Sequence, residues 1–127
     1  MDRFDHHFTE DEAKALLTEL LPTIEELMGI RSRIVELRPE LESGLEKAIG
    51  NGGSQATGEL LSLMSRVNVL VEHIQEAGVL IKDLDRCLLD FPSEREGRIV
   101  FLCWEYGEPE LAFWHDIDAG FTGRQPL

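Results

Sequence analysis

The chain has little cysteine and no long apolar run, and each of these shortages excludes a class of protein. Its two cysteines, Cys87 and Cys103, lack the paired spacing of a zinc site or a disulfide framework. No stretch approaches the roughly 20 apolar residues that a membrane helix needs. Residues 1–7 contain no apolar segment typical of a signal peptide. We therefore expect a soluble protein of the reducing cytoplasm.

Positive charge is also scarce. The 127 residues include 12 Lys and Arg against 25 Asp and Glu, which gives a formal net charge of −13. Proteins that bind nucleic acids or anionic membranes gather basic side chains on one surface, and the sequence contains no such cluster. We expect no nucleic-acid partner and no membrane partner. The length and the 43% of apolar residues predict one globular domain, 1–127.

Helical periodicity dominates the first part of the chain. Thr9 followed by Glu12 predicts a capping box, and apolar residues then recur at helical spacing, which predicts a helix at about 9–49. Pro22 and Pro39 predict bends in one long helix, with a break at Pro39 as the alternative.

A glycine-rich turn at 50–53 separates this helix from a second one at about 55–77, and so short a connection makes the two antiparallel. The turn sets a register in which Arg31 lies across from about residue 72. Arg31 and Arg38 both fall on the predicted apolar seam. They either extend to solvent or pair with neighbours such as Glu72, or they form a polar site inside the hairpin.

The two helices carry more apolar surface than they can bury against each other. The first helix is the longer, and the second has an apolar stripe wider than one partner helix covers. That stripe comprises Leu60, Leu61, Leu63, Met64, Val67, Leu70, Val71 and Ile74. We expect a β module to cover part of this surface and the helices of a second copy to cover the rest, as a homodimer.

After Gly78 the pattern becomes that of short strands. Strand-like runs occupy 79–81, 87–91, 98–105 and 110–115, with polar loops at 92–97 and 106–109. A four-residue loop at 106–109 pairs Val100 with His115 and places Cys103 and His115 on opposite faces. Both faces of this hairpin are apolar, which predicts helices on one face and the tail or a partner chain on the other.

The expected fold is therefore α+β. A long antiparallel helical hairpin (about 9–49 and 55–77) precedes a small antiparallel sheet (about 79–116) and a C-terminal tail. Within the single domain, the hairpin takes up 8–78 and the β module 79–127.

The candidate ligand-binding residues lie at the end of the chain and in one earlier turn. They are Trp104, Glu108, His115, Asp118 and Arg124, with Asp83 and Asp85 from the turn. His115 suits a general base or a ligand because its charge changes near neutral pH, and Glu108 or Asp118 is placed to orient it. Alternatively, His115 only ends a strand, and Arg124 ties down the tail by pairing with a carboxylate.

The spacings favour no metal centre. There is no HExxH, no paired CxxC and no second histidine at ligand spacing. We interpret Asp83, Asp85 and Asp90 as turn residues and solvated strand charges. Cys87 and Cys103 are interpreted as small buried apolar residues, with a Cys103 nucleophile activated by His115 as the alternative.

Several segments resemble a known family. They are 78–85, 90–92, 102–104 with 107–108, 114–126, and the N-terminal Phe8-Thr9 with Glu12-Ala13. Over nearly the whole chain they resemble the prokaryotic family catalogued as domain of unknown function 2203. The resemblance implies a stand-alone prokaryotic protein with helices before a β-rich end, and it implies no activity or cofactor. The pattern departs at Cys87, where the family favours glycine, which implies a tight backbone position.

Together these features predict an uncharacterised, non-enzymatic module that forms a dimer and binds a partner or a ligand. The alternative is an enzyme or a metal-dependent small-molecule binder that uses the residues from Trp104 to Arg124. The two hypotheses differ in what they require of the fold. The first needs an apolar helix face too wide for one chain, and the second needs those side chains to converge in one cleft. The sequence names no ligand, cofactor or reaction.

Overall fold

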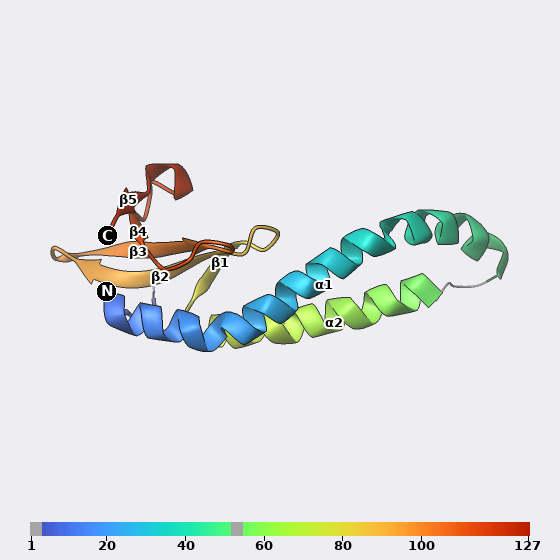
Figure 1. The fold of residues 1–127 in the computed structure, drawn as a ribbon, viewed down its shortest axis with the longest axis horizontal. Helices are drawn as coiled ribbons and strands as arrows, with labels where there is room; N and C mark the ends of the chain where they lie inside the picture. Colours follow the sequence, from blue (N-terminus) through green and yellow to red (C-terminus); the bar gives the residue numbers. More distant parts are fainter. Residues whose placement is uncertain (1–3, 52–54) are drawn as a thin grey trace. The chain divides into compact units, whose positions relative to one another are not determined.

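The computed structural model describes the backbone of residues 4–51 and 55–127 and the side chains of 4–43 and 55–127. Over these residues the elements are α1 (Glu10–Asn51), α2 (Gln55–Glu76), β1 (Leu80–Asp83), β2 (Leu88–Arg95), β3 (Arg98–Glu105), β4 (Phe113–Asp116), the 3-10 helix η1 (Phe121–Gly123) and β5 (Gln125–Pro126) (Figure 1). The predicted α+β fold is confirmed. Contacts divide the chain into two compact units, Met1–Pro22 with His73–Leu127, and Thr23–Glu72. Neither described helix is both long and apolar enough to cross a membrane.

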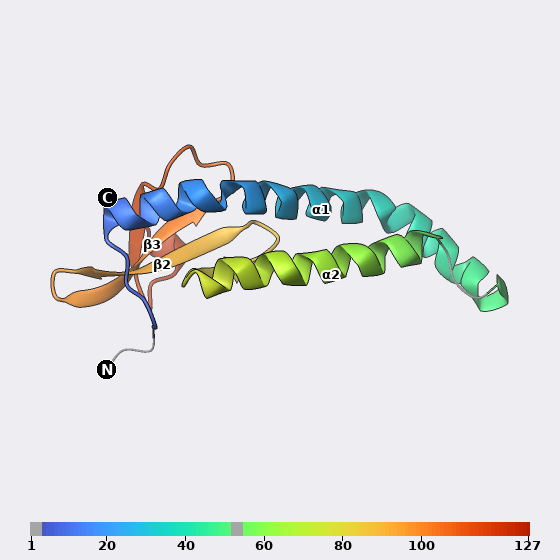
Figure 2. The same cartoon turned by 90° about the horizontal axis from the view of Figure 1, so that it is seen from below.

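Helix α1 begins at the predicted capping box. The Thr9 backbone N–H donates to Glu12 Oε1 at 2.8 Å, and the Glu12 N–H donates to Thr9 Oγ1 at 3.1 Å. The helix continues through Pro22 and Pro39 to Asn51, so the prediction of one long helix is confirmed. It bends toward its C-terminal end (Figures 1 and 2).

Two ion pairs set the register of the helices within the unit Thr23–Glu72. Arg33 donates to Glu59 at 2.5 and 2.8 Å, and Arg66 donates to Glu26 at the same two distances. The predicted register, with residue 31 opposite about 72, is therefore wrong. The reason is that α1 runs well past the point opposite the first turn of α2, so the hairpin is not symmetric about its turn.

The arginines of α1 lie outside its buried seam. Arg31 and Arg38 are both exposed, whereas Ile30 and Leu37, one position before each of them, are 8% and 0% exposed. The hypothesis of a polar site inside the hairpin is wrong, and the interpretation that these arginines extend to solvent is confirmed.

The strands form one antiparallel sheet in the order β1-β2-β3-β4-β5. Strand β2 includes residues 92–95, so the predicted polar loop at 92–97 is wrong. The turn consists only of Glu96 and Gly97, whose φ angles of 52° and 79° suit a tight hairpin. Pro92 fits because its carbonyl faces away from β3 and accepts from the Phe8 N–H at 2.7 Å. Its missing N–H therefore removes no bond between β2 and β3.

The pairing of β3 with β4 differs from the prediction by one residue. Val100 pairs with Asp116, and Phe101 pairs with His115. The connection between these strands is longer than the assumed four residues, and a shift by one residue exchanges the faces of a strand. Cys103 and His115 therefore lie on the same face of the sheet, which corrects the prediction that they lie on opposite faces.

Both faces of the sheet are covered within its own unit. On one face, the ring of Phe8, two residues before α1 begins, lies 5.8 Å from the Phe91 ring. On the other face, the Phe4 ring lies 5.3 Å from the Phe101 ring, and the C-terminal tail also packs there through Arg124, which lies over a β4 ring. Of the predicted alternatives for this second face, the tail or a partner chain, the structure shows the tail.

Cys87 occupies the tight backbone position that the resemblance implied. Its φ is 46°, in the left-handed region where glycine is favoured. Its side chain is completely buried, so the residue combines a strained backbone with a packed thiol.

Candidate functional site

Three of the predicted site residues meet where the tail returns to the sheet. Arg124 Nη2 donates to Glu108 Oε1 at 2.9 Å and to Oε2 at 2.6 Å. The Glu105 N–H also donates to Glu108 Oε1, at 2.6 Å, and Trp104 Nε1 donates to the Glu108 carbonyl at 3.1 Å. The Arg124 guanidinium lies 4.0 Å from the centre of the Phe113 ring. Arg124 thus ties down the tail by pairing with a carboxylate, as the sequence suggested.

This ion pair is largely withdrawn from water. The Arg124 side chain is 12% exposed and that of Glu108 is 21% exposed. Among the described residues, no hydrogen-bond partner reaches the buried Arg124 Nε. Gly123 permits the close approach of the tail, because a Cβ there would lie 2.6 Å from the Ala119 Cβ.

The remaining predicted carboxylates lie elsewhere. Asp118 and Asp85 are exposed. Asp83 Oδ1 accepts from the Arg86 N–H at 3.1 Å, which stabilises the turn between β1 and β2. The positions of Asp83 and Asp85 fit their interpretation as turn residues, and a role in ligand binding stays a prediction for all three carboxylates.

His115 has other partners than Glu108 or Asp118. Its Nε2 lies 3.2 Å from Asp90 Oδ1, and its Nδ1 lies 2.8 Å from the Asp116 carbonyl oxygen. The Cys103 thiol lies close to the same Asp90 carboxylate. Asp90, Cys103 and His115 are 1%, 1% and 3% exposed, and one ligand atom from each lies within 4.8 Å of the other two.

The sheet itself assembles this cluster. Asp90 of β2 pairs directly with Cys103 of β3, and His115 of β4 follows two residues after Phe113, the partner of Cys103. All three side chains therefore project from one face. The interpretation of Asp90 as a solvated strand charge is wrong, and the signal that reveals it is a single acid within the apolar run 88–91.

Burial governs the protonation of the cluster. It raises the pKa of the Asp90 carboxyl, against the opposing effects of His115 and Cys103. Burial, and then the charge of Asp90, raises the pKa of the Cys103 thiol to about 12. At neutral pH this thiol stays protonated, whereas a nucleophilic cysteine needs a lowered pKa. The arrangement therefore does not favour a Cys103 nucleophile activated by His115, although the two are close.

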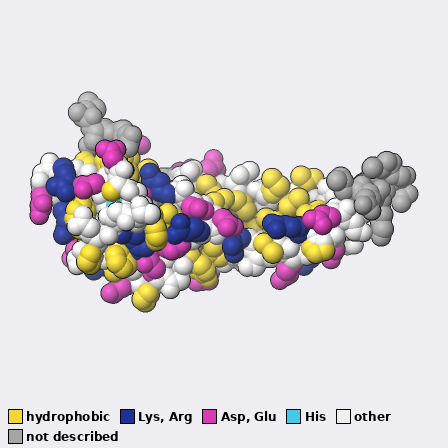
Figure 3. All heavy atoms as spheres, turned by 90° about the horizontal axis from the view of Figure 1, so that it is seen from above, with side chains coloured by type: hydrophobic (Ala, Val, Ile, Leu, Met, Phe, Trp, Pro, Cys, Tyr) yellow, Lys and Arg dark blue, Asp and Glu magenta, His cyan; other side chains and the backbone are white. Residues whose placement is uncertain are grey.

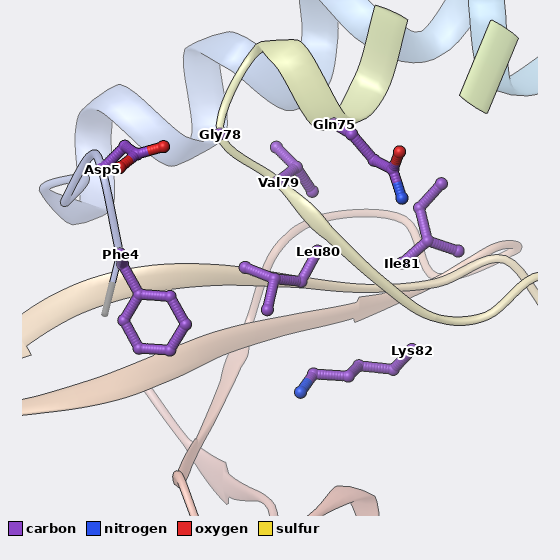
Figure 4. Close-up of a pocket in the computed structure, with 8 residues that line it drawn as sticks. All are labelled: Phe4, Asp5, Gln75, Gly78, Val79, Leu80, Ile81 and Lys82. Carbon is purple, nitrogen blue, oxygen red and sulfur yellow. The ribbon is translucent and has the colours of Figure 1, made fainter. Parts of the chain in front are cut away.

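An open hollow lies along the edge strand β1 in the same unit. Its volume is about 630 Å³, and it is lined by Phe4, Asp5, Gln75 and residues 78–82 (Figure 4). Leu80 in this wall pairs with Asp90, and the Lys82 ammonium lies 4.5 Å from the centre of the Phe101 ring. The hollow thus adjoins the sheet face that carries the buried cluster.

Fold and cluster together define an α+β protein in which a helical hairpin precedes a five-stranded sheet with a buried polar centre. The sequence matches the family described as uncharacterized conserved protein (DUF2203) over residues 6–127, and the chain belongs to this family. No curated protein and no solved structure matches the chain.

Proposed function

We propose that the protein is a non-enzymatic interaction module that forms a homodimer through its helical hairpin. The supporting observation is a set of large apolar side chains that the hairpin leaves open to water. Val35, Leu61, Met64 and Val69 are 48%, 62%, 52% and 53% exposed. Figure 3 shows hydrophobic side chains gathered along the helical part of one face. Such surface is typical of protein–protein contacts.

The distribution of charge supports a second copy as the partner. The unit Thr23–Glu72 contains eight acidic and five basic residues, a net charge of −3, whereas the other unit contains seventeen and seven, a net charge of −10. Two identical chains repel each other through like charges. The hairpin is therefore the part through which two such chains associate with the least repulsion.

Light scattering coupled to size-exclusion chromatography tests the proposal. We expect the mass of a dimer at micromolar concentration for the wild-type chain. We expect a monomer for Leu61→Glu combined with Met64→Glu, because charges then replace the apolar contact. Leu84→Glu is the matched control, since Leu84 is 41% exposed outside the hairpin unit. A wild-type monomer, or dissociation caused equally by the control, contradicts the proposal.

We also propose a location in the prokaryotic cytoplasm. Cys87 and Cys103 are buried and unlinked, as is usual in a reducing compartment. The net charge of −13 supports neither a nucleic-acid partner nor an anionic membrane surface.

A further inference from the structure

The buried cluster has the composition and the spacing of a metal site. Asp90, Cys103 and His115 supply an oxygen, a sulfur and a nitrogen from three adjacent strands. In a tetrahedral zinc site with bonds near 2.05 Å, oxygen and nitrogen ligands lie about 3.3 Å apart. The observed distance between Asp90 Oδ1 and His115 Nε2 is 3.2 Å.

The second nitrogen of His115 is held as in a metal-binding histidine. A carbonyl oxygen only accepts hydrogen bonds, so the contact between His115 Nδ1 and the Asp116 carbonyl places a proton on Nδ1. This bond fixes the ring and turns Nε2 toward Asp90 and Cys103. A backbone carbonyl commonly orients metal-ligating histidines in this way.

Two protons lie among the three candidate ligand atoms, where a metal ion would bind. His115 Nε2 and Asp90 Oδ1 face each other at 3.2 Å and share one proton, because two acceptors would repel. The Cys103 Sγ lies within 4.8 Å of the same carboxylate, and as a thiol it holds a second proton. A divalent ion replaces both protons without changing the net charge of the cluster.

We propose that Asp90, Cys103 and His115 bind one divalent transition-metal ion of the zinc class through Oδ1, Sγ and Nε2. The mixed oxygen, sulfur and nitrogen donors suit zinc and exclude magnesium and calcium, which take oxygen ligands. On binding, the Cys103 S–H bond breaks, a metal–sulfur bond forms, and the thiol proton passes to solvent with the proton shared by His115 and Asp90. No electron is transferred. A fourth coordination position is left for water.

Cobalt(II) is the probe, because a thiolate ligand gives it a near-ultraviolet charge-transfer band. The full chain is stripped of metal with a chelator and titrated with cobalt, and zinc is then added. We expect one cobalt per chain, a charge-transfer band that zinc abolishes, and about two protons released per zinc ion, measured by calorimetry in buffers of different ionisation enthalpy.

Two cysteine variants test which sulfur atom binds the metal. Cys103→Ser should lose the charge-transfer band and bind zinc at least about 100-fold more weakly. Cys87→Ser is the matched control, since Cys87 is equally buried and lies outside the cluster, and it should keep the band. A folded wild-type chain without the band overturns the proposal even if Cys103→Ser fails to fold. So does a band that Cys87→Ser alone removes. The site lies outside the hairpin unit, so this experiment and the dimer experiment can fail separately.

Discussion

Two residues of the sheet region combine properties that oppose each other. Cys87 keeps a left-handed φ of 46° although it has a side chain, and that side chain is completely buried. Asp90 is a carboxylate in the middle of a packed strand, where burial raises its pKa. The first residue retains backbone strain for the sake of packing, and the second retains a polar group that the three-residue cluster keeps hydrogen-bonded.

Replacing each cysteine with glycine should reveal the backbone strain at Cys87. Cys87→Gly should lower the free energy of unfolding by less than about 1 kcal/mol, because release of the left-handed strain offsets the lost packing. Cys103→Gly should cost about 2 kcal/mol or more, because glycine weakens a central strand and leaves a cavity. Urea unfolding followed by circular dichroism measures both. Equal losses would show that the Cys87 backbone is not strained.

At the scale of elements, the sequence predicts what is decided locally. Thr9 and Glu12 lie within one helical turn, and their spacing was enough to place the start of α1. The pairing of β3 with β4 depends on how a long loop folds, and the helix register depends on an asymmetric turn, so both were wrong. The two helices and the pairing of Arg124 with a carboxylate could therefore be predicted from the sequence, whereas the end of β2 and strand β5 were missed. The contact of Asp90 with His115 could not be predicted, because it crosses two strand pairings.

The capping box should make stability depend on pH. Hydrogen bonds from Thr9 hold the pKa of Glu12 below its ordinary value. A carboxyl with a lowered folded pKa stabilises the fold above its unfolded pKa, and this contribution disappears as the pH falls through the folded pKa. Glu12→Gln should therefore be less stable than the wild type at pH 7, and the gap should close in acid.

Thermal unfolding measured from pH 7 down into the acid range gives the difference in stability between Glu12→Gln and the wild type. Glu19→Gln, an exposed position further along α1, is the control variant. A deficit of Glu12→Gln that persists unchanged in acid would mean that the glutamate charge does not stabilise the cap.

At the scale of the whole molecule, charge is divided unevenly between the two units. The unit that contains the sheet carries most of the net charge of −13, while the hairpin unit pairs Arg33 with Glu59 and Arg66 with Glu26 across its helices. Any self-association must therefore overcome repulsion between two acidic chains.

Added salt should consequently favour the dimer. Raising the ionic strength shortens the range of the repulsion to less than about 10 Å, while apolar contacts through the hairpin remain. Sedimentation equilibrium should show a lower dimer dissociation constant at high salt, and the combined Leu61→Glu and Met64→Glu variant should stay monomeric. A dissociation constant that rises with salt would indicate that ion pairs, and not apolar side chains, hold the copies together.

The two outer strands make growth of the sheet from chain to chain unfavourable. Strand β1 has four residues and an irregular register between Ile81 and Asp83, and β5 has two residues, one of them Pro126. Edge strands that are short, bulged or contain proline are poor templates for pairing with another strand. Concentrated solutions of the folded protein should therefore resist fibril formation and gelation.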